Sequence, residues 1–273
     1  MMSIAVIVTT YNRPDALAAV LEGYAAQTDQ GFEMIVADDG STEETRRLVE
    51  AYRARAPFPV THVWQEDRGF RAAAIRNRAL AATEAAYVIF TDGDCIPLPS
   101  FVARHRSLAE RGWFAAGNRV LLSEGFTARV LRERLPVHTW RFGRWVQAWR
   151  RGDINRLAPL VPLPLGGAWR KGAPRRWKGI KTCNLAAWRD DLLRVNGLDE
   201  SYCGWGLEDS DLVVRLIRSG VRHKSARFAA PVLHLWHREN PRHTLEENQR
   251  RLAEVLRSDR VAAAVGIHQY LQP

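Results

Sequence analysis

The sequence has few cysteines and no long apolar segment. Its three cysteines, Cys95, Cys183 and Cys203, lack the close spacing of a zinc site, and their odd number favours a reducing, cytoplasmic location over a disulfide framework. No run reaches the roughly 18–20 apolar residues that a membrane-spanning helix needs, and the longest candidate, residues 157–169, contains three prolines. The N-terminus has no basic segment before its short apolar run, so we do not expect a signal peptide.

Acidic residues are the scarcer charged class, with 30 Asp and Glu against 40 Lys and Arg and a net charge of +10. The imbalance lies in residues 129–178, which hold 13 Arg or Lys, two acids and five of the ten tryptophans. Such a segment suggests contact with an anionic membrane face or an anionic binding partner. The alternative is a solvated basic face whose tryptophans belong to the core. The high isoelectric point also admits a nucleic-acid-binding module, although the charge is confined to one segment.

Short apolar runs alternate with helical patterns in the first third of the chain. Strands are predicted at residues 4–9, 32–37, 60–64 and 86–91. Helices are predicted between them, from Pro14, from Ser41 to Arg55 and over residues 71–82. Ser41 and Glu44 have the spacing of a capping box at the start of the second helix. The alternation predicts an α/β fold with a mostly parallel central sheet flanked by helices.

The pattern is less regular beyond residue 99. It predicts helices over residues 100–111, 129–151, 190–195 and 209–219, a helical tail from 244, strands within 113–122 and 228–236, and a loop over 159–174. We therefore expect a single domain over residues 1–273, made of the segments 1–111, 112–178, 179–243 and 244–273.

Polar residues directly follow three of the predicted strands. They form the segments 9–13 (TTYNR), 38–41 (DDGS) and 91–94 (TDGD). Because ligands of parallel α/β sheets bind at the carboxyl ends of the strands, these segments predict a ligand site along one edge of the sheet.

Asp92 and Asp94 flank Gly93 at one of these strand ends. Two carboxylates there form a hard oxygen site suited to Mg²⁺ or Mn²⁺ bridged to a diphosphate, whereas the alternative is a turn that Asp and Gly simply favour. His234 and His237 follow the last predicted strand and could complete the metal's shell from across a cleft, which favours Mn²⁺. The alternative for each is an ordinary core or surface histidine.

Trp205 stands between two glycines, where its indole could stack on a sugar ring. Glu208, Asp209 and Asp211 follow in the first turn of a predicted helix, whose dipole stabilises ionised carboxylates. Such a carboxylate suits a general base. N-terminal capping explains one or two of the acids, but not the tryptophan between glycines.

These motifs resemble those of known enzymes. TTYNRP, DDGS and TDGDC, in this order, resemble family 2 glycosyltransferases. GWGLEDSD with a later histidine is similar to the C-terminal signature of β-1,4-galactosyltransferases and chondroitin-polymerase-type enzymes. The resemblance covers residues 3–94 and 179–240 and implies a GT-A fold. It implies that residues 1–111 bind a nucleotide sugar and that 179–243 bind the acceptor and hold the catalytic groups, while the basic, Trp-rich insertion 112–178 has no counterpart.

The resemblance also implies roles for single residues. The nucleoside and phosphates of the donor are assigned to Thr9, Tyr11, Arg13, Asp38, Asp39, Arg68, Arg76 and Asp92. The divalent metal, Mn²⁺ or Mg²⁺, is assigned to Asp94, Asp92 and His234, with His237 as the alternative to His234. The acceptor side is assigned to Trp205, Glu208 and Asp211, with Asp209 as the catalytic base and Glu208 beside it.

The expected function is that of an inverting glycosyltransferase that moves a sugar from a UDP-sugar to a hydroxyl of a saccharide or glycolipid, for example an envelope polysaccharide or lipopolysaccharide. The basic segment would contact an acidic acceptor or the inner face of the cytoplasmic membrane, and nucleic acid is not expected as a partner. A nucleotidyltransferase would usually carry a Gly-rich loop where this chain has TTYNRP. An inactive sugar-binding relative would not be expected to retain Asp92, Asp94 and Asp209.

Overall fold

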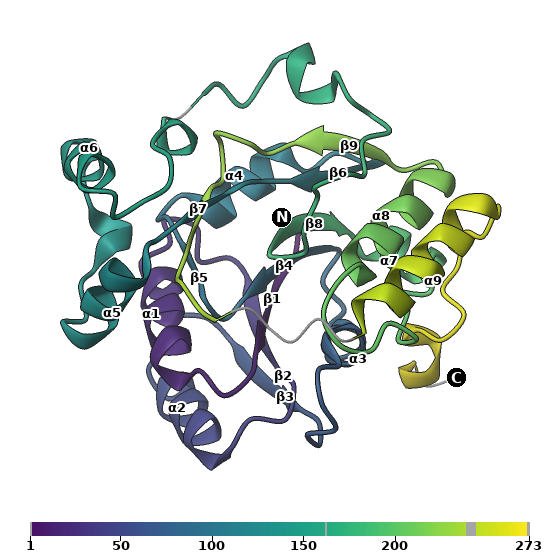
Figure 1. The fold of residues 1–273 in the computed structure, drawn as a ribbon, viewed down its shortest axis with the longest axis horizontal. Helices are drawn as coiled ribbons and strands as arrows, with labels where there is room; N and C mark the ends of the chain where they lie inside the picture. Colours follow the sequence, from purple (N-terminus) through teal and green to yellow (C-terminus); the bar gives the residue numbers. More distant parts are fainter. Residues whose placement is uncertain (1, 162, 239–243, 272–273) are drawn as a thin grey trace.

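A seven-stranded sheet forms the centre of the computed structural model, which describes residues 2–161, 163–238 and 244–271 (Figure 1). Its strand order is β3-β2-β1-β4-β8-β6-β9. These strands are β1 (Ile4–Thr10), β2 (Glu33–Asp38), β3 (Val60–Trp64), β4 (Tyr87–Asp92), β6 (Trp113–Ala116), β8 (Asn184–Trp188) and β9 (Arg222–Ser225). The strands β1 to β4 pair in parallel, and β8 runs antiparallel to both β4 and β6. The sheet is therefore mostly parallel, as the sequence predicted.

A second, three-stranded sheet has the order β5-β10-β7. It consists of β5 (Cys95–Pro97), β7 (Arg119–Leu121) and β10 (Val232–His234). Its central strand, β10, lies antiparallel to β5 and parallel to β7, with His234 opposite Cys95. The small sheet thus brings a segment near the end of the chain next to the turn that follows β4.

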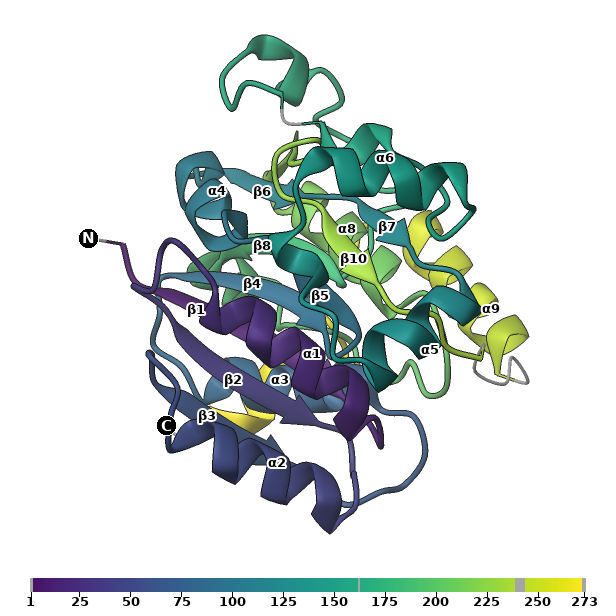
Figure 2. The same ribbon diagram turned by 90° about the vertical axis from the view of Figure 1, so that its left-hand side faces the viewer.

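Helices cover both faces of the large sheet (Figure 2). One layer contains α1 (Pro14–Ala25), α2 (Glu43–Arg53), α4 (Phe101–Leu108), α5 (Glu124–Arg132) and α6 (Phe142–Arg150). The other contains α3 (Ala72–Ala81), α7 (Arg189–Arg194) and α8 (Glu208–Arg218), and α9 (Leu245–Arg257) packs on α8. Strand β1 shows why two layers form, because Ile4, Val6 and Val8 face the first core and Ala5 and Ile7 face the second.

The predicted elements up to residue 92 are all present, but the capping box is wrong. Helix α2 begins at Glu43 with Thr42 as its N-cap, and no side chain caps it. The Ser41 hydroxyl instead accepts a hydrogen bond from the backbone N–H of Asn12 at 2.8 Å. Ser41 therefore joins the turns after β1 and β2.

Two predicted elements beyond residue 99 are divided in the structure. The helix predicted over residues 129–151 is two helices, α5 and α6, because Pro136 lies between them and cannot continue a helix. The strand predicted within 113–122 is β6 and β7, which belong to different sheets. Strands β5, β8 and β9 were not predicted.

The remaining expectations concern the cysteines and membrane spans. The three cysteines are free, which agrees with the absence of a disulfide framework. Within the part of the chain that the structure describes, the helices are too short or too polar to cross a bilayer. Residues 239–243, the end of the expected acceptor-binding segment, lie outside the described residues.

Candidate active site

A cleft of about 570 Å³ opens at the carboxyl ends of β1 and β4. Its lining includes the turn after β1, the turn after β4, the start of α8 and the segment after β10. The structure thus brings together segments from both ends of the sequence. Twelve residues singled out from the sequence line this cleft: Thr9, Tyr11, Arg13, Asp39, Arg76, Asp92, Asp94, Trp205, Glu208, Asp209, His234 and His237.

Asp94, His234 and His237 form a group that can hold a metal ion. Their ligand atoms all lie within 4.8 Å of one another, with His234 Nε2 at 3.7 Å and His237 Nε2 at 3.4 Å from the Asp94 carboxylate. The backbone fixes this arrangement, because the Leu235 N–H donates to the Asp94 carbonyl oxygen at 2.9 Å. Burial lowers the pKa of His234, which keeps its imidazole neutral and able to bind a cation. One carboxylate and two imidazoles suit Mn²⁺.

The structure bears on two of the predicted metal roles. Both histidines approach Asp94, although the sequence indicated one of them. Asp92 is not a member of this group and accepts a hydrogen bond from Arg76 at 2.9 Å, so its role as a metal ligand stays a prediction.

Arg76 connects the two halves of the site. Its guanidinium donates to Thr9 Oγ1 at 3.0 Å, to Asp92 Oδ1 at 2.9 Å and to Glu208 Oε1 at 3.2 Å. The side chain is almost fully buried, with 4% of the residue exposed. Two carboxylates thus match its charge, but the side chain also lines the cleft, so its contact with the donor phosphates or ribose stays a prediction. Arg76 also fixes the start of α8 against β4.

The start of α8 places two acids at the cleft. Leu207, the residue before the helix, has a φ of +78°, a left-handed conformation that a branched residue rarely adopts. Asp209 follows with 5% of its surface exposed, and the ammonium of Lys181 lies 3.4 Å from its Oδ2. Burial, with the neighbouring Asp209, raises the pKa of Glu208, and Arg76 opposes this shift. Asp209 is placed to accept a proton from a molecule in the cleft.

The turns after β1 and β2 also line the cleft. The Tyr11 hydroxyl donates to Asp67 Oδ2 at 2.9 Å, and the Tyr11 ring is half exposed. Asp39 is buried and accepts hydrogen bonds from the Arg71 N–H at 2.8 Å and from Gln65 Nε2 at 2.5 Å. Its carboxylate is therefore held in one orientation, with lone pairs left for a ligand.

Two residues predicted for donor binding do not line the cleft. Asp38 is completely buried and accepts hydrogen bonds from the Ser41 N–H and from His62, so it stabilises the turn after β2. Arg68 is exposed and pairs with Glu66 at 2.7 Å, which neutralises its charge at the surface.

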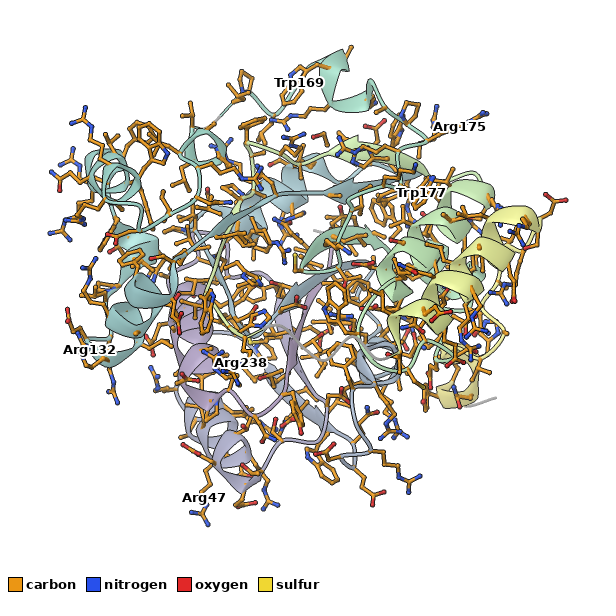
Figure 3. The ribbon with its side chains drawn as sticks, viewed as in Figure 1. Arg47, Arg132, Trp169, Arg175, Trp177 and Arg238 are labelled. Atoms are coloured by element: carbon orange, nitrogen blue, oxygen red, sulfur yellow. The ribbon has the colours of Figure 1, made fainter. Side chains whose placement is uncertain are left out.

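Sequence reasoning missed three cationic residues of the cleft: Arg119, Lys181 and Arg238 (the last labelled in Figure 3). Arg119 lies in β7, and its guanidinium makes no hydrogen bond or ion pair with any residue that the structure describes. Arg119 and Lys181 lie in or beside strands that the sequence pattern did not resolve, whereas Arg238 directly follows His237 and could have been included with it.

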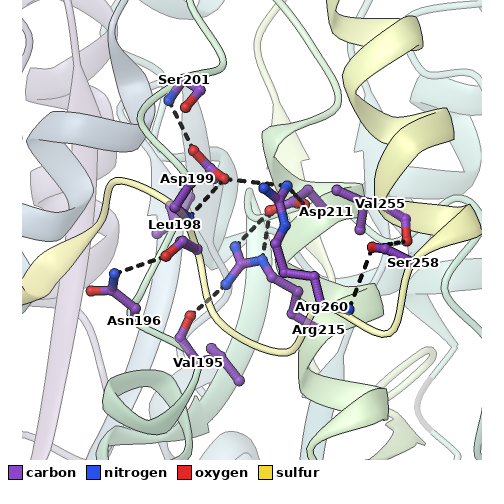
Figure 4. Close-up of polar contacts among 12 residues, drawn as sticks. Val195, Asn196, Leu198, Asp199, Ser201, Asp211, Arg215, Val255, Ser258 and Arg260 are labelled. Atoms are coloured by element: carbon purple, nitrogen blue, oxygen red, sulfur yellow. Dashed lines mark hydrogen bonds and ion pairs between the residues drawn. The ribbon is translucent and has the colours of Figure 1, made fainter.

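Asp211 also departs from its predicted role, since it does not line the cleft and its carboxylate lies among Arg215, Arg260 and Asp199 (Figure 4). Its side chain is completely buried and pairs with Arg215 at 2.6 Å. Arg215 also donates to the carbonyl oxygens of Val195 and Gly197. An acid with no exposed surface cannot contact an acceptor, so Asp211 holds α8 against the preceding loop.

We expect Asp211→Asn to destabilise the fold, because it leaves the buried charge of Arg215 without its counterion. The free energy of unfolding should fall by about 3 kcal/mol in denaturant titrations, the order observed when one partner of a buried pair is removed. Asp190→Asn is the matched control, since Asp190 pairs with Arg111 at the surface and its loss should change stability by under about 0.5 kcal/mol. Unchanged stability with weaker acceptor binding would restore the role predicted from the sequence.

Two family profiles match consecutive parts of the chain, and residues from both parts line the cleft. Residues 5–167 match the profile of glycosyl transferase family 2, and residues 168–238 match that of the N-terminal domain of galactosyltransferase. The chain is 31% identical over 226 residues to validoxylamine A glucosyltransferase of Streptomyces hygroscopicus subsp. jinggangensis, which covers 80% of this chain and 52% of that protein. It is 25% identical over 259 residues to chondroitin synthase of Escherichia coli, covering 87% of this chain and 35% of that protein. The chain thus spans about half the length of the first relative and less of the second.

Solved structures share the fold at low sequence identity. Residues 1–349 of Staphylococcus aureus TarS in complex with UDP match with a TM-score of 0.60 and 16% identity, over 98% of this chain and 68% of that one. The mannosyltransferase PcManGT of Pyrobaculum calidifontis, in complex with GDP-Man and Mn²⁺, matches with a TM-score of 0.61 and 18% identity, over 93% of this chain and 64% of that one. These similarities confirm the GT-A fold expected from the sequence.

Proposed function

Because the chain belongs to glycosyl transferase family 2, we propose that it is an inverting, metal-dependent glycosyltransferase that takes its sugar from a nucleoside diphosphate donor. The observation that supports this most strongly is the shared cleft, in which the group Asp94, His234 and His237 lies with the buried carboxylate of Asp209. One group fits a divalent cation and the other fits a general base, the two functions that single-displacement sugar transfer requires.

The charges of the cleft support a divalent cation. Its lining contains five cationic side chains, Arg13, Arg76, Arg119, Lys181 and Arg238, and five anionic ones, Asp39, Asp92, Asp94, Glu208 and Asp209. With neutral histidines the lining has no net charge, so it offers little attraction to a dianionic diphosphate. Mn²⁺ or Mg²⁺ held by Asp94, His234 and His237 would supply two positive charges, which neutralise charge on the departing nucleoside diphosphate.

The chain's own residues provide positioning and proton transfer. Asp209 accepts the proton of the acceptor hydroxyl, which attacks the anomeric carbon from the face opposite the leaving group. Lys181 lies 3.4 Å from the Asp209 carboxylate and helps to hold it in place. Arg76 orients Asp92 and Glu208 on either side, and Trp205 offers an indole to a sugar ring. A single displacement of this kind converts an α-linked donor into a β-glycoside.

We infer a UDP-sugar as the donor and a saccharide or glycolipid hydroxyl as the acceptor. The TarS structure contains UDP and the mannosyltransferase structure contains GDP-Man, so both pyrimidine and purine donors occur among proteins of this fold. The proposal of UDP rests on the resemblance of the motifs TTYNRP and DDGS to those of family 2 glycosyltransferases. Tyr11 and Asp39 belong to these motifs, and both line the cleft. An envelope polysaccharide as acceptor rests on the basic segment alone.

The basic segment carries exposed aromatic residues as well as charge. Phe142 and Trp149 lie on the same face of α6, two helical turns apart, and Trp169 lies in the segment that follows. All three side chains are about half exposed. Aromatic rings beside arginines are typical of surfaces that meet anionic lipid headgroups. The chain would then act at the inner face of the cytoplasmic membrane as a peripheral protein.

A donor screen tests the proposed reaction. Purified protein is mixed with Mn²⁺ and a panel of UDP- and GDP-sugars, and thermal shifts identify the donor that raises the melting temperature. With that donor and an acceptor, we expect release of the nucleoside diphosphate. Release of pyrophosphate from a nucleoside triphosphate and a sugar phosphate would instead identify a nucleotidyltransferase.

A further inference from the structure

A second cavity lies outside the cleft, between α5 and α6. It has a volume of about 250 Å³. It is lined by Arg129, Leu135, Trp140, Arg144, Gln147 and Arg151, which we call the arginine pocket. Aromatic contacts hold its walls, since the Trp140 ring packs on Trp145 at 5.1 Å and on Phe126 at 5.6 Å between centroids. Packed aromatic rings therefore support one wall of the pocket, and the side chains of Arg144, Gln147 and Arg151 are exposed.

The arginine pocket contains more positive charge than its neighbours neutralise. Arg129 and Arg151 both pair with one oxygen of Asp153, at 3.0 and 3.1 Å. Arg144 lies over the Trp140 ring at 5.7 Å and has no carboxylate partner in the described part of the chain. Three guanidinium groups thus share a single carboxylate, which leaves two net positive charges around the cavity. Like charges held this close repel one another unless an anion lies between them.

The geometry points to a phosphate-binding site in the arginine pocket, which holds a phosphate group of the acceptor or of the lipid that carries it. Guanidinium groups bind phosphate oxygens in pairs, which explains why arginine rather than lysine lines the cavity. Gln147 adds an amide donor, and Leu135 and Trp140 provide an apolar wall for the adjoining part of the ligand. The identity of this ligand as the acceptor rests on the proposed function, whereas the phosphate site itself does not.

The pocket is connected to the active site through α5. Thr127 Oγ1 on this helix accepts a hydrogen bond from the Trp236 N–H at 2.8 Å. Trp236 lies between His234 and His237 in the sequence, so the helix that supplies Arg129 is fixed to the segment that supplies both imidazoles. A ligand bound by Arg129 is thereby connected, through α5, to the segment that carries His234 and His237.

Calorimetric titration of the whole chain with inorganic pyrophosphate, in EDTA and without donor, tests the site. Arg144→Gln should weaken binding about tenfold, since one charge-assisted hydrogen bond to an anion contributes a factor of this order. Arg47→Gln is the matched control, because Arg47 is an exposed arginine on α2 that lines neither the arginine pocket nor the cleft, and its loss should leave the affinity unchanged. Arg144 is exposed, so its replacement should not alter the melting temperature.

Two further measurements identify where the phosphate binds and what carries it. If Arg119→Gln in the cleft abolishes pyrophosphate binding while Arg144→Gln does not, the arginine pocket is not a phosphate site. Co-sedimentation with phosphatidylglycerol vesicles, against phosphatidylcholine vesicles, then separates the sources. Arg144-dependent sedimentation identifies a lipid headgroup, whereas Arg144-dependent pyrophosphate binding without sedimentation identifies a phosphorylated saccharide. Because no donor or metal is present, failure of this site would leave the proposed sugar transfer unaffected.

Discussion

Asp209→Asn is expected to lower the rate of sugar transfer by about 10²–10⁴-fold, the range that a general base contributes. The amide has nearly the same shape as the carboxylate but cannot take the proton of the acceptor hydroxyl. Donor binding should stay within about twofold of wild type, because in the proposed mechanism Asp209 meets the acceptor hydroxyl rather than the nucleoside diphosphate. The rate is measured as release of nucleoside diphosphate, and donor affinity by calorimetry.

Two controls separate loss of the base from damage to the fold. Asp259→Asn removes an exposed carboxylate outside the cleft and should leave both rate and affinity unchanged. The melting temperature of Asp209→Asn should change little, since the substitution removes the ion pair with the partly exposed Lys181 at 3.4 Å, whereas the amide oxygen can still accept the hydrogen bond from the Ser210 hydroxyl. A variant that transferred sugar at the wild-type rate would show that another group takes the proton.

The sequence predicted those parts of the fold whose signals are local. Each of β1 to β4 is a short apolar run, and each intervening helix has its own apolar face, so the order of elements and the positions of the strand ends followed directly. Strand β8 is different, because it consists of five residues that pair with β4 in the antiparallel direction. Only the fold determines that pairing, since the two strands are about 90 residues apart in the chain.

The site shows the same division between local and distant signals. The acids at the strand ends and at the start of α8 could be found because they lie within short motifs. The bond between Arg76 and Glu208 joins residues separated by 132 positions, and no pattern of the sequence indicates it. The different fates of Asp209 and Asp211 follow from helical geometry. Residues two apart on a helix point about 200° away from each other, so only one of the two acids can face the cleft.

Asp94→Ala is expected to weaken Mn²⁺ binding by more than about 100-fold. Removal of a residue that only orients a metal ligand already costs about 10- to 100-fold in affinity, and Asp94 is proposed to be a ligand itself. Asp94 provides the carboxylate of the proposed metal group and lies within 3.7 Å of both imidazole nitrogens. Without it, two neutral histidines remain and the site loses its negative charge. Mn²⁺ affinity is measured by titration without donor, and transfer activity should fall to the level that wild type shows in EDTA.

The donor provides a second measurement that does not depend on turnover. In EDTA, wild type and Asp94→Ala should bind the donor with similar weak affinity, because the cleft then has balanced charges in one protein and a single extra positive charge in the other. Added Mn²⁺ should strengthen donor binding to wild type alone. His234→Ala and His237→Ala should each reduce this metal-dependent gain, since both rings approach the same carboxylate. If Mn²⁺ strengthened donor binding to Asp94→Ala as much as to wild type, the cation would have to bind elsewhere, and charge neutralisation by this group would be wrong.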